Sequence, residues 1–281
     1  MKQMKLGKRG HGTGFWVALI LLGIGSFIMI MPLVWMILSS FKTQNELLVM
    51  PPKFLPKSWD LKNFKQVFKE IPFLRYYANS LGVSIINTIV GIFTACLFGY
   101  VFAKYEFPGR NLLFTVLLAC MMIPYDTLVA TVYKEMIAIG WTNSYLVLTV
   151  PYFVSIFGVF LMRQFYADLP DDYLHSAEID GCGQFRTFIS VAVPLARPTM
   201  AALAIYTFML SYNSYLWPLV SVNSNKLFTL TVGVASFLDD RGSQMALMMA
   251  ASSMMIIPVC IVFALAQKQF VAGMTVGGIK G

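Results

Sequence analysis

A short stretch near residue 215 carries side chains that are suited to holding a sugar. In SYNSYLWPL, residues 211–219, aromatic rings alternate with an amide at Tyr212, Asn213, Tyr215 and Trp217. Aromatic faces stack on sugar rings, and amides exchange hydrogen bonds with hydroxyl groups. An aromatic belt at a membrane surface has the same composition, so a binding site and a belt both remain open.

Asp126, in MIPYDTLVA, is the only carboxylate well inside an apolar run of the sequence. An acid within a membrane is a candidate functional group. Pro124 breaks the helix just before it, and the polar residues 133–135 follow closely, which favours a wetted position near the outer end of a span. We therefore expect no proton relay at Asp126.

Motifs for catalysis and for cofactor binding are missing from the sequence. The chain contains no H-E-x-x-H, no G-x-S-x-G and no pair of carboxylates within apolar runs, so an enzyme is not expected. It lacks the G-x-x-x-x-G-K-[ST] loop that cradles nucleotide phosphates. Its 4 cysteines show no C-x-x-C spacing and it has only 2 histidines, which argues against disulfides and a metal site. We predict no catalytic residue, no cofactor and no metal ligand.

The elements that must position these side chains are membrane-spanning helices. Of the 281 residues, 58% are hydrophobic and only 12% are charged, and the mean hydropathy is +0.69, which is typical of an integral membrane protein. Continuous apolar runs long enough to cross a bilayer predict an all-α fold with six transmembrane helices, at about 15 to 40, 78 to 103, 111 to 131, 143 to 163, 198 to 221 and 245 to 267. The net charge of +8 fits basic membrane flanks better than nucleic-acid binding.

The second predicted helix has two distinctive stripes. Small residues recur every four positions at Gly91, Ala95, Gly99 and Ala103, which lets another helix approach closely, so we expect this stripe to lie against protein. The earlier half of the same helix carries amide and hydroxyl groups that either line a path or cross-link helices; they are Asn79, Ser80, Ser84 and Asn87.

The one long polar interruption, residues 168–198, predicts a short helix at about 170 to 180. Pro170 suits a first turn, acidic residues follow it at the positive end of the helix dipole, and Gly181 supplies a stop. Leu174 and Ala177 fall on an apolar face. So short an amphipathic helix either packs on its own bundle or enters a partner's groove.

This interruption resembles the EAA loop of binding-protein-dependent ABC importers. The matching positions are Leu169, Pro170, Ala177, Ile179, Asp180, Gly181, Phe188, Pro194 and Pro198, while His175 and Ser176 depart from the usual pattern. The resemblance implies a cytoplasmic coupling helix that docks into a separate ATPase through a loop comprising Tyr173, Leu174, His175, Ala177, Asp180 and Gly181. We expect Leu174 and Ala177 to be buried in the ATPase groove, a positive φ at Gly181, and a solvent-facing His175.

Two further motifs extend the resemblance over about residues 70 to 281. Asn213, Trp217, Pro218 and Leu219 match W-N-x-F-x-W-P-L, and QKQFVAGMTVGGIKG resembles the closing motif of carbohydrate ABC importer permeases, the relatives of the smaller maltose-system subunit. The resemblance implies a type I ABC importer permease fold, with Asn213, Tyr215 and Trp217 on the substrate path. It also implies a homologous permease subunit, two ATP-binding subunits that hold ATP and Mg, and an extracytoplasmic sugar-binding protein. An ion-coupled secondary transporter is the alternative.

Orientation depends on the four basic charges before the first helix and on the EAA loop, because Lys and Arg are nearly balanced between the two sides. Both place the N- and C-termini in the cytoplasm of a multi-pass protein of the cytoplasmic membrane, with the first helix retained as an anchor. We expect an N-terminal helix and extracytoplasmic loop at 1–75, the transmembrane domain at 76–267 and a cytoplasmic tail at 268–281. The amphipathic stretch of about 61 to 68 would contact a binding protein or lie on the membrane.

Overall fold

The structure, a computed structural model, describes residues 13–238 and 244–277, with side chains for 14–238 and 244–265. Throughout this part of the chain the regular elements are helices, which confirms the all-α prediction. In chain order they are α1 (Thr13–Ser39), α2 (Gln44–Leu47), α3 (Lys62–Glu70), α4 (Phe73–Lys104), α5 (Arg110–Cys120), α6 (Tyr125–Ala138), α7 (Tyr145–Thr149), η1 (Val150–Tyr152), α8 (Ile156–Asp168), α9 (Asp172–Ile179), α10 (Gln184–Thr187), η2 (Phe188–Ala192), α11 (Val193–Leu195), α12 (Arg197–Tyr212), α13 (Leu216–Ser221), α14 (Leu230–Ala235), η3 (Ser236–Leu238) and α15 (Met245–Gly277).

Four helical stretches of the described chain are by themselves long and apolar enough to cross a membrane: Gly14–Ser39, Phe73–Lys104, Tyr145–Asp168 and Met245–Leu265. Two further candidates are bent pairs, Arg110–Cys120 with Tyr125–Ala138 at 103° and Gln184–Leu195 with Arg197–Tyr212 at 77°. The predicted count of six is reached when each bent pair is one span.

The prediction of continuous helices is wrong at the runs 111–131 and 198–221, which are broken by a proline and by an unwound segment. Pro124 is the N-cap of α6 and has an extended backbone, so the apolar run 111–131 is broken between α5 and α6. The run 198–221 is interrupted after Tyr212, where Asn213 caps α12, and the helix resumes only at Leu216. Conversely, α15 continues to Gly277, beyond the predicted end of the last span, while residues 278–281 lie outside the described part.

The chain divides into two compact units, Met1–Val67 with Leu238–Met254, and Phe68–Phe237 with Met255–Gly281. In the first unit the segment after α1 is held by its own polar contacts. The Lys42 ammonium donates to the Lys53 carbonyl at 2.6 Å and lies 4.1 Å from the centre of the Trp35 ring. The Asn63 amide donates to the carbonyls of Ser40 and Lys42. The amphipathic stretch forms the helix α3. Its contact with a binding protein or with the membrane surface stays a prediction.

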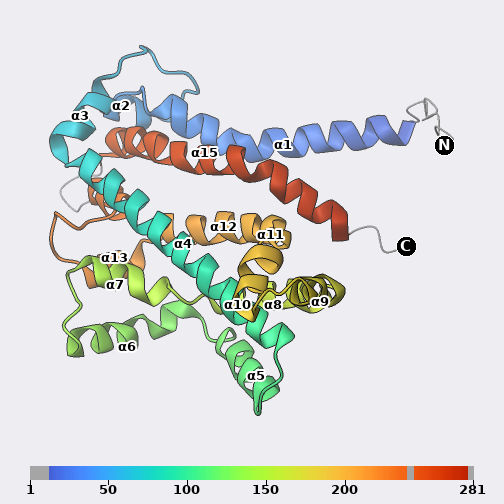
Figure 1. Ribbon diagram of the computed structural model, residues 1–281. Coiled ribbons are helices and arrows are strands. Elements are labelled where there is room, and N and C mark those ends of the chain that lie inside the picture. The colour runs from blue at the N-terminus through green and yellow to red at the C-terminus, as the bar shows by residue number, and fades with distance from the viewer. Residues whose placement is uncertain (1–12, 239–243, 278–281) are drawn as a thin grey trace. The chain divides into compact units, whose positions relative to one another are not determined.

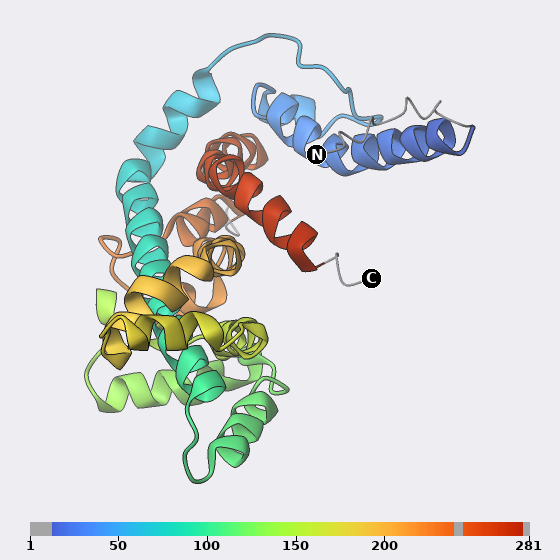
Figure 2. The ribbon, with the colours of Figure 1, turned by 45° about the vertical axis from the view of Figure 1, so that its right-hand side comes forward.

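The second unit is organised around α4, against which α8 and α12 pack (Figures 1 and 2). A Cβ placed on Gly99 would lie 2.6 Å from Met162 Cβ and 2.8 Å from the Arg163 amide nitrogen, both on α8. Ala95 is fully buried in the same core. The prediction that the small-residue stripe lies against protein is confirmed.

The polar stripe of α4 cross-links the unit. The Asn79 amide donates to the carbonyls of Lys226 and Phe228 at 3.0 and 2.9 Å. Ser80 Oγ accepts a hydrogen bond from the Leu230 amide at 2.7 Å. Such bonds satisfy polar groups that are buried away from water, so these two side chains fasten the segment before α14 to α4.

Candidate functional site

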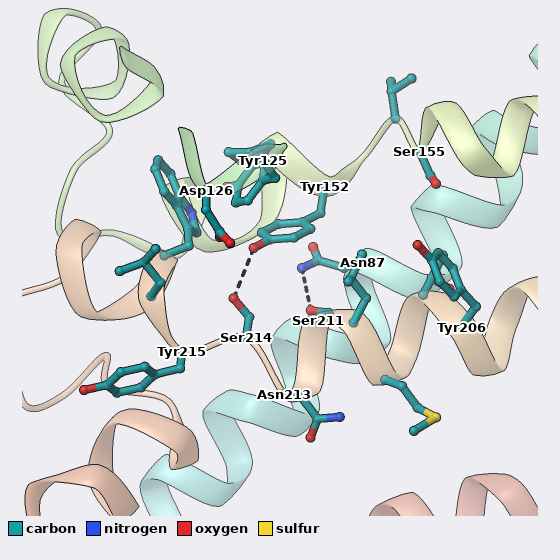
Figure 3. A pocket seen from close by; sticks show the side chains of 17 residues that line it. Asn87, Tyr125, Asp126, Tyr152, Ser155, Tyr206, Ser211, Asn213, Ser214 and Tyr215 are labelled. Carbon is teal, nitrogen blue, oxygen red and sulfur yellow. Dashed lines mark hydrogen bonds between the residues drawn. The ribbon is translucent and has the colours of Figure 1, made fainter. Parts of the chain in front are cut away.

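A cavity of about 700 Å³ opens in the second unit, and the predicted trio lines it. Its walls come from α4, α6, η1, the residues just before α8, the end of α12 with the segment that follows, and the start of α13 (Figure 3). Five aromatic residues contribute to the lining, namely Tyr125, Tyr152, Tyr206, Tyr215 and Trp217. Asn87, Asp126, Ser211, Asn213 and Ser214 add polar groups. The cavity therefore joins flat apolar surface to amide and hydroxyl groups.

The break between α12 and α13 displays the predicted residues. Asn213 is exposed and its amide N–H closes the last turn of α12 on the Met209 carbonyl at 3.0 Å. Tyr215 is 43% exposed. Trp217 is 1% exposed, and its Nε1–H donates to the Val147 carbonyl at 2.7 Å. The structure thus brings all three to one cavity, with Trp217 held as a fixed wall and the other two open.

Tyr212 does not belong with the trio. It is buried, its hydroxyl donates to the Met255 carbonyl at 2.9 Å, and its ring stacks on Phe208. Its place in the aromatic cluster of the sequence reflects core packing within the second unit.

Sequence reasoning missed the opposite wall of the cavity. Tyr152 lies in η1, and its hydroxyl is 3.2 Å from Ser214 Oγ, in the loop beyond α12 (Figure 3). Tyr125 and Asp126 open α6 directly after the Pro124 break. The available signal was a proline followed by a tyrosine, at 124–125 and again at 151–152. Tyr152 is 62 residues from Ser214 in the sequence, so the sequence did not indicate that they lie together.

Asn87 is the one member of the polar stripe that reaches the cavity. Its Nδ2 donates to the Leu148 carbonyl at 3.1 Å and to Ser211 Oγ at 2.9 Å. The residue is 3% exposed, and its Oδ1 accepts no hydrogen bond from any group in the described chain. A buried acceptor left open costs free energy unless something else donates to it.

Asp126 is exposed at the first turn of α6 and lines the same cavity. The carboxylate therefore belongs to the cavity, and its wetted position near the outer end of a span stays a prediction. Within the described residues, no cluster of three or more His, Cys, Asp or Glu side chains is arranged to hold a metal ion.

The second candidate element is α9 with the turn that ends it. The Gly181 amide donates to the Glu178 carbonyl and the Cys182 amide donates to the Ala177 carbonyl, both at 2.9 Å. These two bonds form a Schellman motif, which requires a left-handed residue at its centre. Gly181 has φ +80°, so the expected positive φ is confirmed and Asp180 is the C-cap before it.

The start of α9 is tied to the end of α4. The Lys104 ammonium donates to the Leu169 carbonyl and to the Asp171 carboxylate, each at 2.6 Å. The hydrogen bond and the charge of Lys104 lower the pKa of Asp171 below its ordinary value. Lys104 thus connects the element to the helix around which the unit is organised.

The expectation that an ATPase covers Leu174 and Ala177 is wrong. Both are 7% exposed within this chain, where Leu174 joins the core that contains Tyr166 and Phe188. A short amphipathic helix buries its apolar face on whichever surface is nearest, and here that is its own bundle. The apolar side chains left open around the turn are Tyr173, Ile179 and Phe185. His175 is exposed, as expected, with Nδ1 3.4 Å from Glu178 Oε2.

Comparison with known proteins gives a consistent set of similarities. Residues 87–276 match the family described as "Binding-protein-dependent transport system inner membrane component". The chain is 35% identical to the arabinooligosaccharides transport system permease protein AraQ of Halalkalibacterium halodurans, over 95% of this chain and 96% of the relative. It is 31% identical to the diacetylchitobiose uptake system permease protein NgcG of Streptomyces coelicolor, over 92% and 87%. Its fold resembles that of a chain in the crystal structure of a bacterial ABC transporter involved in the import of the acidic polysaccharide alginate, with a TM-score of 0.81 at 20% identity, over 95% of this chain and 100% of that one.

Proposed function

Because the chain belongs to the family of binding-protein-dependent transport system inner membrane components, we propose that it is the permease subunit of an ATP-driven ABC importer that carries an oligosaccharide across the cytoplasmic membrane. The chain is an all-α, multi-pass membrane protein with the type I permease fold. The arabinooligosaccharide and diacetylchitobiose systems of its relatives support the sugar as cargo.

The cavity is the observation that carries the assignment to a sugar. Aromatic residues form its walls, so a sugar ring could lay its apolar face on Tyr215 or Tyr152 while its hydroxyls meet Asn213. A volume of about 700 Å³ is within the range of small-ligand sites and accommodates a short stretch of sugar chain rather than a long one. Asn213, Tyr215 and Trp217 are the proposed substrate-path residues.

Energy would come from partner subunits. The sequence carries no phosphate-binding loop, so ATP and Mg²⁺ would bind to two ATPase subunits, with a second homologous permease subunit and an extracytoplasmic sugar-binding protein completing the importer. The loop of α9 would face the cytoplasm, together with both termini. Tyr173, Ile179 and Phe185, which are exposed around a rigid glycine turn, are the contacts we assign to the ATPase.

An ion-coupled secondary transporter is not supported. That mechanism needs ionisable groups which take up and release the coupling ion within the membrane. Among the described residues Asp126 is the single carboxylate lining the cavity, and family membership favours the binding-protein-dependent route.

Thiol accessibility tests the proposed path. Asn213→Cys, in a background with the 4 native cysteines replaced by serine, should react with a water-soluble maleimide at rates that differ between the ATP-free and the ATP-trapped importer. Met122, an 84% exposed residue that does not line the cavity, supplies a comparison, and Met122→Cys should show no such difference. An Asn213→Cys thiol that is inert in both states would contradict the assignment of this cavity to the path.

A further inference from the structure

We propose that the cavity selects uncharged, hydroxyl-rich sugars over acidic ones, and that Asp126 is the residue that sets this preference. The inference rests on the proposed function and specifies its substrate class. The fold does not decide the matter, because a similar fold occurs in an importer of an acidic polysaccharide. The lining of this chain's own cavity must decide it.

The charge of the lining favours an uncharged ligand. Among the described residues that line the cavity, Asp126 is the one carboxylate, and no Lys, Arg or His stands beside it. None of the ion pairs between described residues involves Asp126, so no cation of the described chain pairs with it. A uronate, sulfate or phosphate group entering the cavity would lose hydration and meet a like charge with no compensating cation.

The balance of hydrogen-bond donors and acceptors in the lining also favours a sugar with free hydroxyls. Asn87 uses its Nδ2 on Leu148 and Ser211, so it offers no free donor to an acidic group. Asp126 offers two acceptor oxygens. Acceptors call for donors on the ligand, and sugar hydroxyls supply them, whereas an ionised acid group brings acceptors alone.

Asp126 and Tyr152 line the same cavity (Figure 3). A sugar ring stacked on this tyrosine could donate a hydroxyl to the Asp126 carboxylate. At separations of about 7 Å and an effective dielectric constant of about 20, a like charge on the ligand would weaken binding on the order of tenfold or more.

Protection of a thiol measures the preference directly. Leu216 lines the cavity, is 40% exposed and is not among the proposed sugar contacts, so a cysteine there reports on occupancy. The assembled importer, in nanodiscs and carrying Leu216→Cys in the cysteine-free background, is treated with a water-soluble maleimide in the presence of arabino-oligosaccharides, malto-oligosaccharides or oligogalacturonides of equal length. We expect the neutral sugars to slow labelling, and the oligogalacturonide to require at least about tenfold higher concentration for the same protection. Equal protection by neutral and acidic sugars would overturn the charge preference while leaving the cavity as a sugar site.

Removing the charge identifies the residue. Asp126→Asn keeps the side-chain size, and it should bring protection by the oligogalacturonide to within about threefold of the neutral sugars. Glu135→Gln makes the same charge change on the same helix, outside the cavity lining, and should leave the ratio as in the parent. An unchanged ratio in Asp126→Asn, with a parental melting temperature, would refute the role of this carboxylate. Absence of protection by every sugar in every variant would instead overturn the sugar assignment of the cavity and the preference with it.

Discussion

Gly99→Leu should separate α4 from α8. A Cβ at this position would lie 2.6 Å from Met162 Cβ, whereas ordinary contacts begin near 3.4 Å, so the neighbouring helix must yield by about 0.8 Å. A side-chain end could rotate away, but the second close atom, at 2.8 Å, is the backbone nitrogen of Arg163. The strain must therefore be absorbed by movement of the α8 backbone.

The free energy of this overpacking can be bounded. Inserting a methyl into a closely packed site costs about 1–3 kcal/mol, and Gly→Ala in a helix returns about 1 kcal/mol, so Gly99→Ala should lose at most about 2 kcal/mol of stability. Gly99→Leu adds three further carbons at the same contact and should lose more than about 3 kcal/mol.

Two glycines on the same helix serve as controls. A Cβ on Gly82 meets nothing within 4 Å, and one on Gly91 meets the Tyr152 carbonyl oxygen at an ordinary 3.6 Å. Gly82→Leu and Gly91→Ala should thus equal or exceed parental stability, because each replaces a helical glycine without strain. The assay is the melting temperature of the purified chain in detergent, together with its recovery in the assembled importer. Gly99→Leu with parental melting, assembly and transport would refute the packing argument.

Three further changes test other parts of the structure. Gly181→Val places a β-branched residue at φ +80° and should weaken ATPase co-purification and sugar-stimulated ATP hydrolysis. Gly183→Val is the control, because Gly183 has φ −69° and open space around its Cβ, and it should change neither quantity. Parental values for Gly181→Val would contradict the coupling role of the turn. Lys104→Met should also lower stimulated hydrolysis, and should raise the pKa of Asp171 toward its ordinary value. The pKa of Asp171 is lowered in the folded chain, so the stabilisation by the Lys104–Asp171 pair is complete above the ordinary carboxyl pKa and is lost as pH falls through the lowered pKa. Sugar-stimulated ATP hydrolysis by the parent should therefore not change through this pair between about pH 6 and pH 8. Trp217→Phe removes the indole donor from a buried carbonyl and should cost about 1–3 kcal/mol in thermal stability; an unchanged melting temperature would show that the bond is dispensable.

Local features were the ones that could be predicted from the sequence. The spacing of small residues through Gly99 and the helix stop at Gly181 each depend on a few neighbouring residues, and the structure retains both. The predicted continuous helices over 111–131 and 198–221 are interrupted. Amphipathicity predicted that Leu174 would be covered, but it cannot say by what, because the surface that covers it is built from distant segments such as the one containing Phe188.

The cavity depended on long-range folding. Asn87, Asp126, Tyr152 and Ser214 meet there although they come from four separate segments. Each had a weak local signal, such as an amide within an apolar helix or an aromatic residue after a proline. Only the packing of α4 against α8 and α12, and the breaks in the apolar runs, bring those signals together.

The most direct test of the proposed function is uptake by proteoliposomes that contain this chain with its permease, ATPase and binding-protein partners. Accumulation of a radiolabelled arabino-oligosaccharide should require ATP on the ATPase side and should persist when ionophores collapse the proton and sodium gradients. Uptake that continues without ATP and disappears with the ionophores would contradict the account.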